Sequence, residues 1–327
     1  MSALVAIVGP TATGKSALGI ALAEVLGGEI LACDSTAVYR RIDIGTDKVP
    51  LSEQRGIPHH LVDLVEPDDV FSAARYAREA ADVARDVVAR GRLPILVGGT
   101  GFYYRALVRG IFPGPSRDDA LRARLDRVAD RRGVESLHRW LARIDLPSAQ
   151  RIQPRDRKRL VRALEVYLLT GRPLTEHFED TISPIADFRV LTIGLTMARE
   201  AILPRVAKRV AQQFDAGVVD EVRALLASGV PATAHALSGL VYRQVLEMLH
   251  GVRDEAVTRE LIVRENMRYA RRQAIWFRSE PGVQWIPGPG ETTAARDAAL
   301  AIVRPWLAET AGSEDPVVGD ARRQITR

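Results

Sequence analysis

The segment "LVAIVGPTATGKSALGIALAEVL" (residues 4–26) limits the possible folds more than any other part of the chain. Its first residues form an apolar run typical of a buried strand, and residues 16–26 have the spacing of a helix. Between them, Gly9–Ser16 fits the pattern G-x-x-x-x-G-K-[ST]. In this strand–loop–helix context the glycines let backbone N–H groups approach a phosphate, and the helix N-terminus favours negative charge. The segment therefore predicts a parallel α/β sheet with a phosphate cradle.

Every residue of this loop is a candidate for binding a diphosphate. The candidates are Gly9, Pro10, Thr11, Ala12, Thr13, Gly14, Lys15 and Ser16. Lys15 would supply positive charge, and the Ser16 hydroxyl would hold Mg²⁺. The loop alone does not distinguish a nucleoside triphosphate from another diphosphate.

Further strand and helix signals alternate along the chain. Apolar runs at residues 28–35, 93–101 and 188–196 indicate strands, and residues 59–65 form a weaker candidate. Residues 72–91 begin with Ser and end at Gly, as a helix does. This alternation indicates a parallel sheet flanked by helices, with ligands at the carboxyl edge of the strands.

Two polar corners follow these strands. Asp34 ends the strand at 28–35, and Thr100 lies in the Gly-Gly-Thr-Gly run after the strand at 93–101. Both should face the same crevice as the cradle. Asp34 could be a Mg²⁺ ligand, a general base for an acceptor group, or a cap for the next turn. The spacing does not select among the three.

The net charge differs among three segments of the chain. Residues 1–114 carry 12 Lys/Arg against 13 Asp/Glu, residues 115–210 carry 20 against 13, and residues 211–327 carry 14 against 15. The middle part is thus +7 and helical in texture, which suits either solvated helix faces or a nucleic-acid surface. We expect a core of residues 1–114 and 186–307, a basic helical insertion at 115–185, and a disordered tail at 308–327.

Other features of the sequence set limits on the protein's class. The sequence has no apolar run long enough to span a membrane and no basic N-terminal leader, and its one cysteine, Cys33, cannot form an internal disulfide. These features fit a protein of the cytoplasm, and we expect it to be a monomer. His59 and His60 lack partners at metal-ligand spacing and are expected to be structural.

Taken together, six segments resemble the tRNA dimethylallyltransferase (tRNA isopentenyltransferase) family. They run in family order over residues 4–287: "GPTATGKS", "DSTAVYRRIDIGTDKV", "PHHLVD", "LPILVGGTGFYYRAL", "RIQPRDRKRLVRALEVYLLTGRPL" and "RYARRQAIWFR". The family is similar to P-loop kinases in its core, which agrees with the sheet expected above. The chain departs from the family pattern at Val241, where Gly is usual, and at Met267, where a smaller residue or one with a hydroxyl is commoner.

The resemblance implies a substrate and roles for the site residues. It implies that the cradle binds dimethylallyl diphosphate, with Mg²⁺, and that the dimethylallyl group goes to the exocyclic amine of the adenosine 3′ to the tRNA anticodon. It assigns Asp34 as the base and places Thr100 near the transferring group, while Lys15 would stabilise the diphosphate as it leaves. The implied tRNA contacts are Asp34, Ser35, Thr36, Ala37, Thr100, Arg122, Lys158, Arg159, Leu160, Val161 and Arg162.

Three rival functions use the same sequence features. A small-molecule kinase would bind ATP in the cradle, and an adenylate isopentenyltransferase would act on free AMP. Neither needs a basic insertion. A nucleic-acid-binding module with a vestigial nucleotide site would not need an intact Gly14-Lys15-Ser16 together with Asp34.

Overall fold

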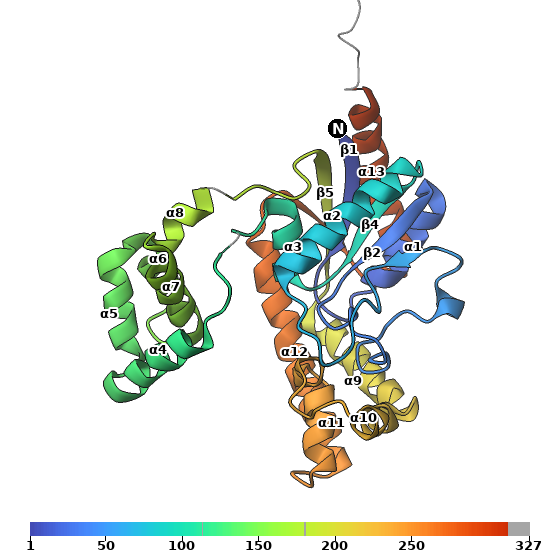
Figure 1. The fold of residues 1–327 in the computed structure, drawn as a ribbon. Coiled ribbons are helices and arrows are strands. Elements are labelled where there is room, and N and C mark those ends of the chain that lie inside the picture. Colours follow the sequence, from blue (N-terminus) through green and yellow to red (C-terminus); the bar gives the residue numbers. More distant parts are fainter. Residues whose placement is uncertain (113, 180, 313–327) are drawn as a thin grey trace, which may run out of the picture. The chain divides into compact units, whose positions relative to one another are not determined.

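The computed structural model describes residues 1–112, 114–179 and 181–312. The chain forms two compact units (Figure 1): an α/β unit of residues 1–108 with the chain from Ile185 onward, and a helical unit, Arg109–Pro184. The helical unit thus begins at Arg109, before the expected position 115. The expected tail starts at 308, whereas helix α13 (Thr293–Gly312) continues past that point. The rest of that tail, 313–327, lies outside the described residues.

A six-stranded sheet, parallel throughout, forms the centre of the α/β unit, and the predicted fold class is confirmed. The strand order is β3-β2-β4-β1-β5-β6. The strands are β1 (Ser2–Val8), β2 (Gly28–Cys33), β3 (His59–His60), β4 (Leu93–Gly98), β5 (Phe188–Thr196) and β6 (Val283–Pro287).

Two strand expectations need correction. The weaker candidate at 59–65 forms only the two-residue β3. The sequence analysis identified no strand after residue 196, but β6 pairs with β5 along the sheet edge. This strand is short and buries Ile286 between the exposed Trp285 and Pro287, so it has no continuous apolar run to identify it.

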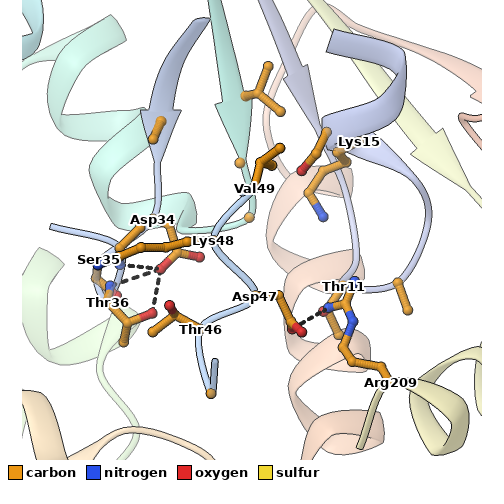
Figure 2. Close-up of a pocket in the computed structure, with 18 of the residues that line it drawn as sticks. Thr11, Lys15, Asp34, Ser35, Thr36, Thr46, Asp47, Lys48, Val49 and Arg209 are labelled. Carbon is orange, nitrogen blue, oxygen red and sulfur yellow. Dashed lines mark hydrogen bonds and ion pairs between the residues drawn. The ribbon is translucent and has the colours of Figure 1, made fainter. Parts of the chain in front are cut away.

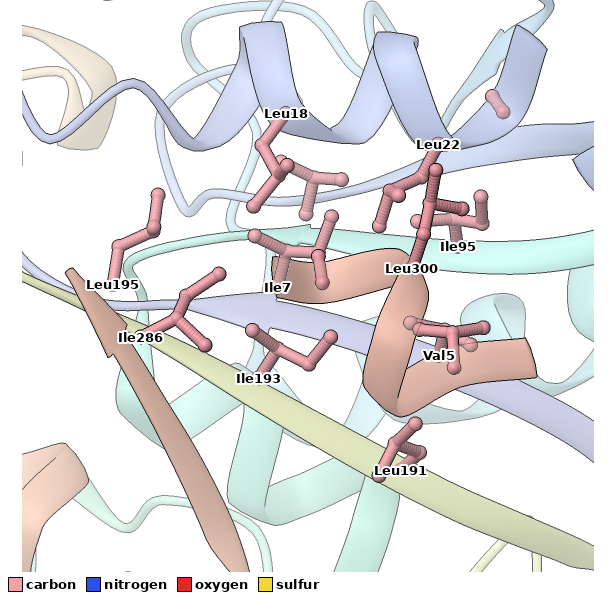
Figure 3. Close-up of a cluster of buried hydrophobic side chains, with 14 of the residues drawn as sticks. Val5, Ile7, Leu18, Leu22, Ile95, Leu191, Ile193, Leu195, Ile286 and Leu300 are labelled. Carbon is pink, nitrogen blue, oxygen red and sulfur yellow. The ribbon is translucent and has the colours of Figure 1, made fainter. Parts of the chain in front are cut away.

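Helices cover both faces of the sheet. Helices α1 (Lys15–Leu26) and α13 contact each other on one face, and α2 (Ala73–Ala89) packs on the other. Figure 3 shows Leu18 and Leu22 of α1 with Leu300 of α13 against Ile7 and Ile193 of the strands. Burying each such side chain contributes about 1.5–3 kcal/mol. This core fixes where the strands end, and therefore where their polar corners lie.

The remaining helices of the α/β unit lie near the carboxyl ends of the strands (Figure 1). They are α3 (Gly101–Arg109), α9 (Arg199–Asp215), α10 (Val218–Ala227), α11 (Tyr242–Leu249) and α12 (Glu255–Arg278), with short 3₁₀ helices η1 (Leu51–Glu53) and η2 (His235–Ser238). Helices α9 and α12 pack against each other. At about 1.5 Å per residue, α12 is roughly 36 Å long, so it can contact the sheet edge with one end and project beyond it with the other.

The helical unit contains α4 (Asp119–Arg132), α5 (Val134–Ile144), α6 (Leu146–Arg151), α7 (Arg157–Thr170) and α8 (Leu174–Glu179). Asp118 and Asp156 cap α4 and α7 by accepting a backbone hydrogen bond from the first turn. The unit has a hydrophobic core of its own, which includes Leu125, Leu141 and Leu160.

Candidate active site

The predicted phosphate cradle is present between β1 and α1. Gly9 and Gly14 have φ of 137° and 85°, values that an L side chain rarely adopts. The hydroxyl of Thr13 is buried and donates to the Pro10 carbonyl at 2.9 Å, which holds the loop in shape. No side chain caps the N-terminus of α1 among the described residues. Its first N–H groups can therefore bind an anion.

Lys15 lies within this loop. Its Nζ donates to the Pro10 carbonyl oxygen at 2.7 Å. Burial and the nearby Arg209 lower the Lys15 pKa to about 7, although Asp34 and Cys33 act in the opposite direction. A bound diphosphate would place negative charge beside the Lys15 ammonium group and would favour its charged form.

Two arginines of α9 contact the cradle, and the sequence analysis did not identify either of them. Arg205 Nε donates to the Ala12 carbonyl at 2.6 Å, and Arg209 Nη1 donates to the Thr11 hydroxyl at 2.9 Å. The two residues are four positions apart, so they share one face of the helix. Arg205 also pairs with Glu291 at 2.6 Å and Arg209 with Asp47 at 3.1 Å, so carboxylates balance part of the positive charge at the cradle.

Asp34 lies at the end of β2, as expected, and its two oxygens differ (Figure 2). Oδ1 accepts hydrogen bonds from Thr36 N at 2.8 Å, Thr36 Oγ1 at 2.6 Å and Ala37 N at 3.3 Å. Oδ2 accepts no hydrogen bond from the described residues. One oxygen therefore caps the turn, and the other remains available for a proton or a cation.

Thr100 joins the two polar corners. Its Oγ1 accepts from Ser35 N at 3.1 Å, and its N–H donates to the Cys33 carbonyl at 3.2 Å. The strands β2 and β4 are neighbours, which places their carboxyl ends together. The two corners are therefore hydrogen-bonded to each other, although among the described residues that line the cavity next to the cradle Asp34 is present and Thr100 is not.

Gln273 of α12 connects the cradle to the second glycine corner and is the other residue that the sequence analysis missed. Its Oε1 accepts from Thr11 N at 2.7 Å, and its Nε2 donates to the Gly99 carbonyl at 2.9 Å. A Cβ at Gly99 would lie 2.1 Å from this Nε2, so only glycine allows the approach. In the sequence, Gln273 stands among the cations and aromatics of "RRQAIWF" (residues 271–277), and nothing local marks it as a buried bridging amide.

These elements enclose one cavity of about 470 Å³. Its walls include the cradle, the Asp34 corner, residues 45–49 after β2, and side chains of α9 and α12. Asp47 lies in this wall beside Arg209 (Figure 2). Burial raises the Asp47 pKa to about 6, although Arg209 and Gln213 act to lower it. The volume suits a small ligand.

The side chains at the cradle supply only part of the oxygen ligands that a hard cation such as Mg²⁺ needs. The Ser16 hydroxyl is exposed on the first turn of α1 and lines the cavity. Over the described ranges no group of three or more His, Cys, Asp or Glu could hold a metal ion. Mg²⁺ binds through few protein oxygens together with substrate phosphates, so the single hydroxyl at the cradle fits that mode. His59 and His60 instead contact the Ile57 carbonyl and Glu29.

The residues expected to contact tRNA in the helical unit fall into two groups. Leu160 and Val161 are buried in its core, so a contact with RNA at these two positions would have to use their backbone atoms. Lys158 and Arg159 are exposed on α7.

Arg122 and Arg162 are ion-paired inside the helical unit. Their guanidinium groups both lie within 2.8 Å of the buried Glu165 carboxylate. Although burial opposes it, hydrogen bonds from the two arginines hold the Glu165 pKa near 2. Glu165 therefore neutralises part of the positive charge of Arg122 and Arg162 within the helical unit.

No described helix combines the length and apolar character needed to cross a membrane.

Comparisons with known proteins agree on one family. Residues 37–280 match the family model described as IPP transferase. The tRNA dimethylallyltransferase of Solibacter usitatus is 47% identical over 309 residues, covering 94% of this chain and 99% of that protein. The protein of the same name from Koribacter versatilis is 44% identical, with 92% and 98% covered. The crystal structure of the tRNA isopentenylpyrophosphate transferase from Bacillus halodurans superposes with a TM-score of 0.69 at 34% identity, covering 96% and 98% of the two chains.

Proposed function

The chain belongs to the tRNA dimethylallyltransferase family, and we propose that the cavity described above is its catalytic site. The protein is a prenyltransferase that moves a dimethylallyl group from dimethylallyl diphosphate to the exocyclic amine of the adenosine 3′ to the anticodon. Asp34 Oδ2, a carboxylate oxygen with no hydrogen-bond partner among the described residues, borders the same cavity as the phosphate cradle, and this one observation supports the proposal most strongly.

At the donor end, the cradle would bind the diphosphate as a leaving group. The bond between the dimethylallyl carbon and the diphosphate oxygen breaks, and its electron pair leaves with the diphosphate. Backbone N–H groups, Lys15 and Arg209 would stabilise the negative charge that develops there. Donors fixed before the reaction are an effective source of such stabilisation, because they need no reorganisation when the charge appears.

At the acceptor end, the adenine amine would attack the same carbon while Asp34 Oδ2 accepts its proton. Oδ1 is held by Thr36 and Ala37, so the carboxylate is oriented before substrate binds. We place Thr100 beside the transferring group, because it is hydrogen-bonded to this corner. The base must leave the anticodon stack to enter the cavity, as in other enzymes that modify bases.

Mg²⁺ would be held by Ser16 together with phosphate oxygens of the donor. When bound it neutralises diphosphate charge.

For tRNA binding, we propose that Lys158 and Arg159 contact phosphates of the anticodon stem, because both are exposed on α7. Ser35, Thr36 and Ala37 would contact the nucleotide through the Asp34 turn. We place the reaction in the cytoplasm, where tRNA is processed.

The test is incubation of the purified protein with dimethylallyl diphosphate, Mg²⁺ and unmodified tRNA, followed by mass spectrometry of nucleosides. We expect isopentenyladenosine. Parallel tubes contain AMP in place of tRNA, or ATP in place of the prenyl donor. Prenylation of AMP alone, or phosphate transfer from ATP without prenyl transfer, would overturn the proposal in favour of the corresponding rival.

A further inference from the structure

A loop of residues 43–48 forms one side of the cavity, through Gly45, Thr46, Asp47 and Lys48. It belongs to no helix or strand. Three side chains from outside the loop bond to its backbone, and they come from α9, α10 and α11. This loop lines the cavity and is hydrogen-bonded to three helices. The geometry of the site can therefore depend on where those helices lie.

Tyr242, at the start of α11, makes the central contact. It is fully buried, and its hydroxyl accepts from Gly45 N at 2.9 Å while donating to Glu221 Oε1 at 2.5 Å. Its ring leaves no room for a side chain at Gly45, since a Cβ there would lie 2.6 Å from a ring carbon. The hydroxyl and the ring together fix the loop at one residue.

Glu221 and Gln213 hold the rest of the turn. Glu221 Oε2 accepts from Asp43 N and Ile44 N, both at 2.9 Å. Gln213 Nε2 donates to the Gly45 carbonyl at 3.3 Å. Oε2 of Glu221 therefore binds the loop, and Oε1 binds Tyr242.

Val241 precedes Tyr242 in a strained conformation. Its φ of 74° and ψ of −62° are rare for a β-branched residue, yet its side chain is buried and lines the same cavity. Such a conformation persists only where its surroundings determine it. Strain at this position indicates that the start of α11 is held in place.

The far end of the loop reaches the cradle. Asp47 Oδ2 lies 3.1 Å from Arg209 Nη1, and the same nitrogen donates to the Thr11 hydroxyl of the cradle. A continuous set of contacts thus runs from Tyr242 through the loop to Asp47, Arg209 and the phosphate-binding residues.

We propose that Tyr242 and Glu221 are positioning residues for prenyl transfer. They hold the 43–48 loop so that Asp47 keeps Arg209 against the cradle. They touch no reacting atom, and their effect falls on the donor's diphosphate and not on tRNA. This inference rests on the proposed function of the cavity.

The test compares Tyr242→Phe with the unchanged protein. Loss of the hydroxyl leaves Gly45 N–H and Glu221 without their partner, and the ring still fills its space. We expect the KM for dimethylallyl diphosphate to rise at least about fivefold and kcat to fall, with the KM for tRNA unchanged. The Kd of inorganic diphosphate, measured by calorimetry without tRNA, should rise with the donor KM.

A double-mutant cycle tests the route. In an Arg209→Ala background, Tyr242→Phe should have no further effect on the donor KM, because the residue through which it acts is gone. Glu221→Gln keeps an oxygen for Asp43 N and Ile44 N but cannot accept from Tyr242. It serves as the second variant if Tyr242→Phe does not fold, and should raise the donor KM by a smaller factor.

Tyr104→Phe is the matched control. It removes another buried hydroxyl, bonded to Thr192 in the sheet at 2.8 Å and away from the cavity. It should lower the melting temperature without changing the donor KM. If Tyr242→Phe behaves in the same way, its role is structural and the inference is wrong. Failure of the unchanged protein to transfer a prenyl group would instead count against the proposed function, and the diphosphate Kd would still test the inference.

Discussion

Asp47 and Arg209 form an ion pair 3.1 Å long on the wall of the cavity that we propose binds a diphosphate. The arginine also donates to the cradle at Thr11, so a carboxylate and the donor would share one cation. Like charges repel, and burial already raises the pKa of Asp47 to about 6. A bound diphosphate would raise that pKa further.

Donor affinity should therefore depend on the charge of Asp47. Above about pH 6 the carboxylate is charged in the free protein, and donor binding must either tolerate the repulsion or take up a proton. Affinity for dimethylallyl diphosphate should fall as pH rises through and above 6. Asp47→Asn keeps an oxygen acceptor for Arg209 but removes the charge. It should bind the donor more tightly at pH 8 and reduce the pH dependence to the part that Lys15 causes by losing its proton near pH 7, as calorimetry from pH 5.5 to 8.5 would reveal. An unchanged slope in this variant would assign the dependence to another group.

Asp34→Asn separates the two roles of that side chain. The amide oxygen can still accept from Thr36 and Ala37, so the turn should keep its shape, but the group cannot take the proton. We expect kcat to fall by about 10²–10⁴-fold with a nearly unchanged melting temperature. Asp86→Asn, on the exposed side of α2, is the control. Full activity in Asp34→Asn would remove Asp34 as the base.

Gln273→Leu should destabilise the cradle, although Gln273 lies far from the cradle in the sequence. It preserves volume but leaves Thr11 N–H and the Gly99 carbonyl without their partner. We expect a loss of about 1–3 kcal/mol of stability, because each buried group would lose its hydrogen bond. Donor affinity should fall as well. Denaturant unfolding and donor binding would measure both, with Gln212→Leu on the exposed face of α9 as the control. Equal donor affinity in the two variants would contradict a role for Gln273 at the cradle.

Glu165 should determine the acid stability of the helical unit. Its folded pKa of about 2 lies below the unfolded value, so its stabilisation is fully present above about pH 4.5 and is lost as pH falls toward 2. Glu165→Ala leaves two arginines without their carboxylate and should cost about 3–5 kcal/mol. Glu135→Ala breaks an exposed pair with Arg155, which solvent screens, and should cost far less stability. Thermal unfolding followed by circular dichroism would compare the variants, and similar losses would show that the Glu165 pairs add little.

The sequence could predict the cradle and the polar corners because their geometry is local. A strand that ends in Asp34 and a strand that ends before Thr100 must meet if both belong to one parallel sheet. Gly9 and Gly14 occupy positions where the backbone needs positive φ. Each inference depends on a few neighbouring residues and on one general rule of sheet geometry.

The side chains of α9 and α12 that contact the cradle could not be predicted in this way. Arg205, Arg209 and Gln273 lie on helices with many polar residues, and only the packing of α9 and α12 determines which of them face the cradle. The same limit applies to Leu160 and Val161, which stand beside exposed cations in sequence but face a core. These identities depend on contacts between segments far apart in the chain.

The pairing of Arg122 and Arg162 with Glu165 has a consequence for how salt affects RNA binding. Association with RNA gains entropy from counterions released when cations meet phosphates, and the slope of log K against log salt reflects how many phosphates are neutralised. Arg122 and Arg162 share one carboxylate, so this cluster keeps only one of its two positive charges and should release fewer counterions than two free arginines. The slope should therefore reflect exposed residues such as Lys158 and Arg159, and should be shallower than the formal charge of the helical segment suggests.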